Sequence, residues 1–376
     1  MHNADVENDT IELEDQEELE LTSHPHQMGT DTEVRIAKEQ SSVFELLRRE
    51  SRGQLVLAPD FQRKDVWDRK RQSELIESIL MGIPIPLIYL FEDENGTRQI
   101  IDGKQRISAL KRFINNDFAL TDLSMLPKLR GMKFSEIPPL LQAKLEDCQL
   151  HSYVIQPPTP EYVKFNIFER VNRNGMNLNK QEMRHALYQG KATRLIQKLA
   201  ESTIFKKSTG SGVKADRMRD RYLVLRFVAF YLLIGGNLPD IEFRSDIDAF
   251  LASVMKFINT KADDEVINNA EKACLRGMRN VFQAVGPEAF RFTSKTGAKR
   301  RPINMGLFEV LIMVFSQVKL DLLPENIDLH DFIEQYKKNF DDIGIFSGAI
   351  DTTEYVNMRF DFAREMIKRI KNAYAN

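Results

Sequence analysis

The residues best suited to chemistry stand where a predicted strand meets a predicted helix, in the stretch QIIDGKQRISALKRF (99–113). An apolar pair runs directly into DGKQR (102–106), and a helical pattern of apolar residues follows. A helix N-terminus presents unpaired backbone N–H groups and partial positive charge, and glycine lets an anion approach the backbone. Lys104 and Arg106 add full charges, and a guanidinium can bind two phosphate oxygens at once. This junction therefore predicts phosphate binding.

Two members of the junction have more than one interpretation. Asp102, at the end of the strand, could hold a Mg²⁺ ion that bridges phosphate oxygens, or it could cap the helix. Gln105 could contact a base, a ribose or a water. DGKQR is not a P-loop, and capping together with surface charge would also account for it. The pentapeptide by itself leaves both interpretations open.

Two other segments supply side chains of the same kinds. PDFQRKDVWDR (59–69) follows a predicted strand and offers Asp60, Gln62 and Arg63. Arg beside Asn or Gln in three separate segments suits recognition of phosphates and base edges, and we expect the three to converge on one polyphosphate pocket. The downstream segment, FERVNRNGMNLNKQEMR (168–184), offers Arg170, Asn172, Gln181 and Arg184. Its Asn-rich run can equally serve only to form a loop.

The elements that would position these segments form a compact α/β unit. Apolar periodicity and turn signals predict helices over 41–50 and 71–82 and strands over 54–61, 87–91 and 97–102. Asn-Gly between the last two strands is a strong hairpin signal. From about residue 191 onward nearly every segment has a helical pattern. The predicted parts are a disordered acidic tail (1–34), a nucleotide-binding α/β domain (35–190) and a helical domain (191–376).

The composition, with 42% apolar and 29% charged residues in 376, is that of an ordinary globular protein. The net charge of −2 hides an asymmetry, because residues 1–34 hold eleven acids and no Lys or Arg, which leaves the remainder at +9. This arm either competes with a polyanion for the basic body or acts as a solubilising tail. No apolar run reaches 18 residues, no secretory signal is apparent and two cysteines give no disulfide framework. We therefore expect a cytoplasmic protein without a membrane span.

Taken in order, PDFQRKDVW, SELIESILMGIPIPLIYLF, IIDGKQRISAL and IFERVNRNGMNLNKQEMRHA resemble the amino-terminal domain of GmrSD-type restriction endonucleases, a family related in fold to ParB and sulfiredoxin. The resemblance covers about residues 40–190, and RMRDRYLVLRFVAFY and RRPINMGLFEVL resemble the family's helical continuation. It implies an α+β fold, in which a small ParB/sulfiredoxin-like mixed α/β domain precedes an all-helical C-terminal domain. The family signature is usually Asp-Gly-Gln-Gln-Arg, and Lys104 replaces the first Gln here.

The resemblance also implies nucleotide binding and, as in several members, NTP hydrolysis. The catalytic roles would fall to Asp102, Gln105 and Arg106, since hydrolysis needs a clamp on the phosphates and an oriented water. Asp102 and Asp60 would hold Mg²⁺, the inferred cofactor. The predicted nucleotide-binding residues are Asp60, Gln62, Arg63, Gly103, Lys104, Ser108, Arg170, Asn172, Gln181 and Arg184.

Three functions are compatible with these patterns. The first is an NTP-binding, NTP-hydrolysing protein linked to DNA recognition in a restriction or antiviral defence system. The alternative is a non-catalytic DNA- or nucleotide-sensing regulator, which the basic loops at 206–214 and 295–301 favour. The third, ranked last, is a DNA nickase that uses the ParB-like site. Six histidines without metal-ligand spacing predict no fused His-Asn-His nuclease, so cutting would need a partner nuclease, and a homo-oligomer stays open.

Overall fold

The structure is a computed structural model, and it describes residues 33–57, 67–172, 179–293, 300–323, 328–346 and 350–373. The chain divides into two compact units. The sheet unit comprises the described residues of Pro25–Leu178, and the helical unit comprises the described residues of Asn179–Asn376.

The sheet unit is built around a five-stranded mixed sheet in the order β1-β5-β3-β4-β2. β1 pairs with β5 and β3 pairs with β4 in antiparallel fashion, whereas β3 with β5 and β2 with β4 are parallel pairs. Because β2 and β4 are parallel neighbours, their carboxyl ends point toward the same edge of the sheet. The strands span Arg35–Ser42 (β1), Leu55–Val56 (β2), Ile88–Glu92 (β3), Arg98–Asp102 (β4) and Gln149–Gln156 (β5).

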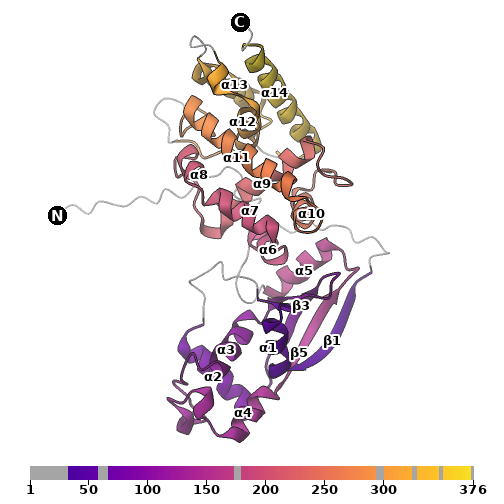
Figure 1. Ribbon diagram of the computed structural model, residues 1–376, viewed down its shortest axis with the longest axis vertical. Helices are drawn as coiled ribbons and strands as arrows, with labels where there is room; N and C mark the ends of the chain where they lie inside the picture. Colours follow the sequence, from indigo (N-terminus) through magenta and orange to yellow (C-terminus); the bar gives the residue numbers. More distant parts are fainter. Residues whose placement is uncertain are drawn as a thin grey trace, which may run out of the picture. The chain divides into compact units, whose positions relative to one another are not determined.

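Helices α1–α4 lie on one side of this sheet, and their apolar stripes form the core together with the inward residues of the strands (Figure 1). Val43, Ile76 and Phe113 come from three of these helices and are completely buried. α5 packs against β4, and its Lys164 lies 5.9 Å from the centre of the Phe91 ring. The helices span Val43–Ser51 (α1), Arg69–Met81 (α2), Lys104–Ile114 (α3), Pro139–Glu146 (α4) and Glu161–Asn172 (α5).

Local signals in the sequence explain where several of these elements begin and end. The Ser42 hydroxyl accepts a hydrogen bond from the Glu45 N–H at the start of α1, and the Asp68 carboxylate accepts one from Arg71 N–H at the start of α2. Gly82 ends α2 in the left-handed conformation, at φ 75°. The predicted helices and the hairpin of the sheet unit are therefore confirmed.

Strands β1, β2 and β5 were harder to predict from the sequence than the β3–β4 hairpin. β5 was not predicted because buried Ser152 interrupts the alternation of apolar residues on its core face. β1 is polar over most of its length and has an exposed Ile36, so it carries no strand pattern either. Of the strand predicted over 54–61, the described part contributes Leu55–Val56, and residues 58–66 lie outside the described residues.

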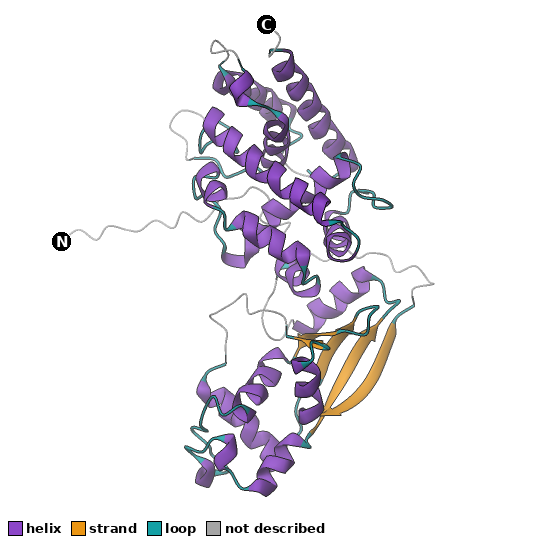
Figure 2. Cartoon of the chain, viewed as in Figure 1, coloured by secondary structure: helices purple, strands orange, loops and turns teal. Residues whose placement is uncertain are grey.

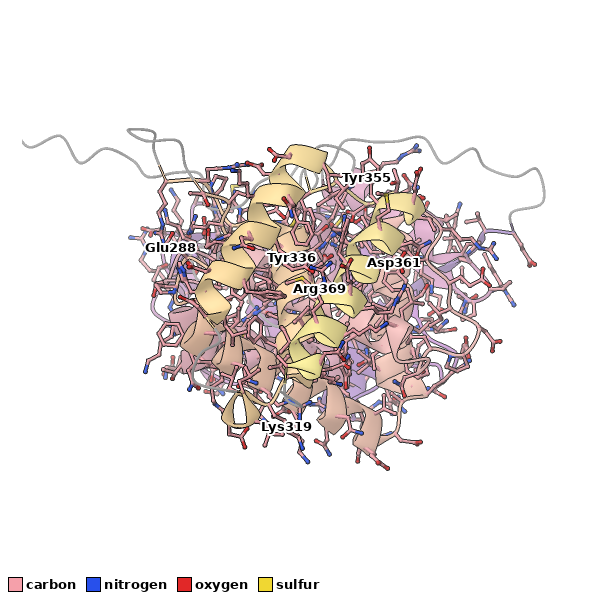
Figure 3. The ribbon with its side chains drawn as sticks, turned by 90° about the horizontal axis from the view of Figure 1, so that it is seen from above. Glu288, Lys319, Tyr336, Tyr355, Asp361 and Arg369 are labelled. Carbon is pink, nitrogen blue, oxygen red and sulfur yellow. The ribbon has the colours of Figure 1, made fainter. Side chains whose placement is uncertain are left out.

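The helical unit is arranged around α12, which packs against α9, α11 and α14. Every residue from Met305 to Ser316 is buried, as expected for a helix with neighbours on all sides. Arg369 of α14 lies over the ring of Tyr336 of α13, with 5.6 Å between guanidinium and ring centre (Figure 3). The helices span Lys180–Leu187 (α6), Lys191–Ala200 (α7), Thr203–Ser208 (α8), Arg219–Ile234 (α9), Ile247–Thr260 (α10), Asp264–Ala284 (α11), Met305–Gln317 (α12), Leu329–Ile343 (α13) and Thr353–Asn372 (α14).

The described part of the helical unit consists of helices and loops, and the sheet belongs to the other unit (Figure 2). The predicted α+β class, with a small mixed domain followed by a helical region, is therefore confirmed. Within the described ranges, no helix combines the length and the apolarity that a membrane span needs.

The boundary between the units differs from the predicted one. It lies before Asn179, whereas the sequence suggested residue 190. The reason is α6, whose contacts lie in the helical unit: the Asn179 amide donates a hydrogen bond to the Arg217 carbonyl over 2.7 Å. Asn179 and Glu182 form a capping box at the start of α6.

Candidate phosphate-binding turn

The turn between β4 and α3 is shaped by a glycine. Gly103 is the residue before α3 and has φ 99°, in the left-handed region that side chains disfavour. A Cβ atom at this position would lie 3.1 Å from the Ile88 side chain, so the turn also packs closely on β3. In the described part of the chain, no side chain caps the first turn of α3. The helix terminus thus keeps the positive end of its dipole for a ligand.

Arg106 is held by the protein itself. Its guanidinium donates hydrogen bonds to the carbonyls of Pro86 and Leu87, which lead into β3, and to Asp102 Oδ2 over 2.8 Å. Only 8% of the residue is exposed. Burial lowers the pKa of the Arg106 guanidinium, and the charge of Asp102 offsets part of this effect. Arg106 therefore ties the turn to the adjacent strand.

The other side chains of the turn are more accessible. The Asp102 side chain is 41% exposed, although one of its oxygens is bound to Arg106. Lys104, Gln105 and Ser108 are half-buried in the first turns of α3. The Gln105 side-chain oxygen accepts a hydrogen bond from the Trp67 N–H over 3.4 Å. Gln105 thus connects the turn to the chain that immediately precedes α2.

The upstream motif falls outside the described residues, and this applies to Asp60, Gln62 and Arg63. The described chain on either side of it approaches the turn. β2 runs parallel to β4, with Val56 the register partner of Gln99, and Trp67 is bound to Gln105. The described residue that follows 58–66 is therefore bound to the turn, and the strand that precedes this stretch points toward it.

The downstream motif is divided between the two units. Arg170 lies in the last turn of α5, where it is exposed and has no hydrogen bond or ion pair to any described residue. Nothing is described of the Asn172 side chain. Gln181 and Arg184 belong to α6 of the helical unit. The structure thus brings together Asp102, Gly103, Lys104, Gln105, Arg106 and Ser108, and it places Arg170 in the same unit.

Gln181 and Arg184 have partners within the helical unit. Arg184 is completely buried and forms an ion pair with Asp248 over 2.5 Å, and its Nε donates to the Gln181 side-chain oxygen over 3.1 Å. Lys180 binds the second oxygen of Asp248 over 2.7 Å. Burial raises the pKa of Asp248, but the two cations outweigh this effect and lower it. In this arrangement Arg184 neutralises the Asp248 carboxylate and links α6 to α10.

A larger buried ionic cluster was missed by the sequence analysis. Arg226 of α9 binds Glu309 of α12 over 2.5 Å and Asp351 over 2.6 Å, and Arg359 of α14 binds Glu309 over 3.2 Å. Burial lowers the pKa of the Arg226 guanidinium, but the carboxylates of Asp351 and Glu309 outweigh burial and raise it well above its ordinary value. The sequence signal for this cluster was the single charged residue inside each of two apolar runs, Arg226 in VLRFVAF and Glu309 in GLFEVLIM. A buried charge requires a partner, so these two residues could have been expected to pair.

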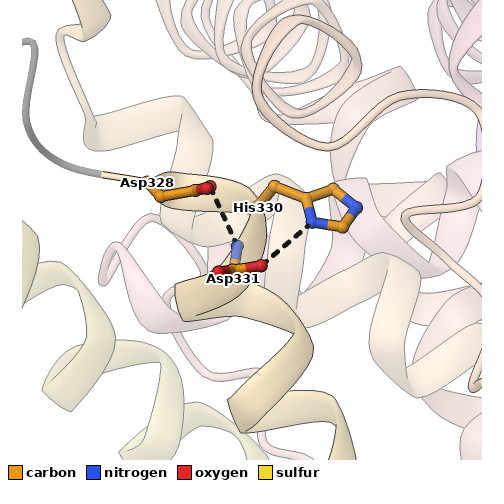
Figure 4. A group of neighbouring side chains, drawn as sticks. All are labelled: Asp328, His330 and Asp331. Carbon is orange, nitrogen blue, oxygen red and sulfur yellow. Dashed lines mark hydrogen bonds and ion pairs between the residues drawn. The ribbon is translucent and has the colours of Figure 1, made fainter.

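One exposed group of potential metal ligands lies at the start of α13, where Asp328, His330 and Asp331 approach one another (Figure 4). Asp328 caps the helix, since its carboxylate accepts the Asp331 N–H over 3.0 Å. His330 Nδ1 lies 3.6 Å from the Asp331 carboxylate. Helix capping accounts for this geometry without an ion.

Residues 43–189 match the family described as GmrSD restriction endonuclease, N-terminal domain. No curated protein matches the chain. A solved structure that matches is the C-terminally truncated chromosome-partitioning protein ParB from Caulobacter crescentus complexed with CTP-gamma-S, at 12% identity and a TM-score of 0.20, covering 63% of this chain and 98% of that chain. The resemblance inferred from the motifs is therefore confirmed over residues 43–189, which match the N-terminal domain of GmrSD restriction endonucleases.

Proposed function

We propose that the sheet unit binds a nucleoside triphosphate at the turn between β4 and α3, and that this binding serves a restriction or antiviral defence system. The observation that carries the proposal is the left-handed Gly103 at the start of an α3 that no described side chain caps. Such a terminus favours an anion, and Lys104 adds a full positive charge in the first helical turn. The description of the matching family, a restriction endonuclease, supports the biological setting.

The contacts of the turn suggest a role in nucleotide binding for each of its residues. Lys104 would contact the phosphates, and the backbone beside Gly103 would approach them closely. Arg106 would act as a positioning residue, because its guanidinium already binds Pro86, Leu87 and Asp102. Gln105 would orient a water or the ligand, while holding Trp67.

A magnesium ion fits this turn as a partner of the phosphates. The partly exposed carboxylate of Asp102 offers one oxygen besides the one that Arg106 binds, and Mg²⁺ commonly takes one or two carboxylates together with phosphate oxygens. Asp60 would be the second carboxylate. The ion would neutralise the charge on the phosphate oxygens during hydrolysis.

The test is phosphate release from each of the four NTPs by the purified full chain with Mg²⁺, with and without DNA. We expect turnover that falls at least tenfold in Asp102→Asn, with Asp117→Asn, an exposed acid after α3, as the matched control. Arg106→Ala is unsuitable, since it removes three bonds that hold the turn. Equal release by wild type and Asp102→Asn would contradict the assignment of hydrolysis to this site.

A second candidate is a DNA-sensing regulator without turnover, and one surface of the helical unit favours it. Lys272, Arg276 and Arg279 form an exposed stripe along α11, and none of them has a carboxylate partner among the described residues. Such a stripe suits contact with a phosphate backbone, whose affinity falls steeply with salt. DNA binding weakened in a Lys272→Gln/Arg276→Gln variant, with no NTP hydrolysis in wild type, would favour this candidate. DNA, a partner nuclease and a second copy of the chain remain the partners that we propose to test.

A further inference from the structure

The face of the sheet that points away from α1–α4 carries two tyrosines side by side. Side chains alternate between the two faces along a strand, and Ile88, Leu90 and Val154 point into the core. Tyr89 and Tyr153 therefore point to the opposite face. They are register partners on the parallel strands β3 and β5, and their ring centres are 5.6 Å apart.

Cationic and polar side chains of the edge strand continue this row. Lys38 of β1 is the register partner of Tyr153, and its amine lies 5.7 Å from the centre of that ring. Lys38 is exposed and has no carboxylate partner in the described ranges. Two residues further along β1, on the same face, the exposed Gln40 and His151 side chains are 3.1 Å apart. The row thus combines flat rings, a positive charge and groups that hydrogen-bond.

We propose that this face, termed the tyrosine platform (Lys38, Gln40, Tyr89, His151 and Tyr153), binds single-stranded nucleic acid. Partly exposed rings on the sheet face offer stacking surfaces for unpaired bases, and Lys38 would contact the phosphates. Gln40 and His151 can hydrogen-bond base edges, which are accessible in a single strand. A duplex keeps its bases stacked on each other, so it cannot use the two rings. Tyr89 is the register partner of Asp102 at the end of β4, so the platform borders the turn, but it uses other side chains and does not depend on the nucleotide proposal.

The experiment is a fluorescence anisotropy titration of the full chain with a labelled twelve-nucleotide oligo(dT) and with a duplex of the same length. We expect tighter binding of the single strand, and we expect Tyr153→Phe, which keeps the ring, to bind within twofold of wild type. Tyr153→Leu, which keeps apolar bulk but no ring, should bind about tenfold more weakly. Lys38→Gln should weaken binding and reduce its salt dependence.

Two matched controls complete the test. Tyr355→Leu changes a partly exposed tyrosine of α14 in the helical unit (Figure 3), and Lys144→Gln changes an exposed lysine of α4; neither should alter oligonucleotide affinity. NTP titration of the Tyr153→Leu variant should give the wild-type result, which separates this proposal from the nucleotide site. No binding of the oligonucleotide by wild type, or equal affinity of Tyr153→Leu and Tyr153→Phe, would overturn the proposal.

Discussion

Two arginine–carboxylate contacts in this chain have the same chemistry and opposite surroundings. In the sheet unit, Arg106 binds Asp102, whose side chain is 41% exposed. In the helical unit, Arg226 binds Glu309, and neither side chain is exposed at all. The first contact lies at a strand–helix turn, and the second lies between two core helices.

The difference separates a ligand site from a structural one. Each charge of the buried cluster is used by another residue of the chain, and a ligand could reach it only by opening the core. At the turn, Arg106 binds only one of the two Asp102 oxygens, and no described side chain caps the first turn of α3. Charged residues at motif positions therefore indicate a binding site only where their partners leave part of the charge accessible.

The largest expected effect is loss of stability on breaking the buried cluster. Glu309→Gln leaves Arg226 and Arg359 without their shared carboxylate, and removing one partner of a buried pair costs about 3–5 kcal/mol. Urea unfolding followed by circular dichroism measures this. Glu242→Gln, which breaks an exposed pair with Arg244, should cost about 0.5 kcal/mol or less. Similar losses in both variants would remove the contrast between buried and exposed pairs.

The next effect is a loss of stability in acid caused by His185. Burial, with a smaller contribution from Arg221, lowers the pKa of His185 to about 4. Below pH 6.5, the ordinary pKa of histidine, His185 binds a proton in the unfolded chain but not in the folded chain. His185 therefore does not reduce the free energy of unfolding above pH 6.5. As the pH falls from 6.5 toward 4, it lowers this free energy by about 3 kcal/mol at most. His185→Gln should flatten this part of the stability profile, whereas exposed His330→Gln should not. An unchanged profile in His185→Gln would show that other groups cause the slope.

A smaller effect should follow from the close packing of the turn. Gly103→Ala places a side chain at positive φ and 3.1 Å from Ile88, and we expect a loss of about 1–2 kcal/mol. Gly96→Ala, in the hairpin loop, has a similar φ but open space around its Cβ, so it should cost less. Thermal unfolding of both variants measures the difference. Equal losses would mean that backbone conformation alone matters at Gly103.

Helices α1 and α2 and the β3–β4 hairpin could be predicted because they follow clear periodic patterns and have ordinary start signals, such as the Asp68 cap of α2. The turn after β4 was also found from residue types alone. The structural role of Arg106 could not be predicted from residue types. Its partners Pro86 and Leu87 are about twenty residues away in the sequence and bind it through their backbone carbonyls. For the same reason Arg184 suggested a ligand contact, whereas its ion pair with Asp248 exists only through tertiary packing.

The central claim is that the turn after β4 binds a triphosphate, and equilibrium titration of the full chain with each NTP and Mg²⁺ tests it most directly. We predict saturable binding of at least one NTP, weakened about tenfold, or about 1.4 kcal/mol, in Lys104→Ala. Lys144→Ala, an exposed lysine of the same unit, should bind as wild type does. Absence of NTP binding, or equal affinity in Lys104→Ala and wild type, would contradict the claim.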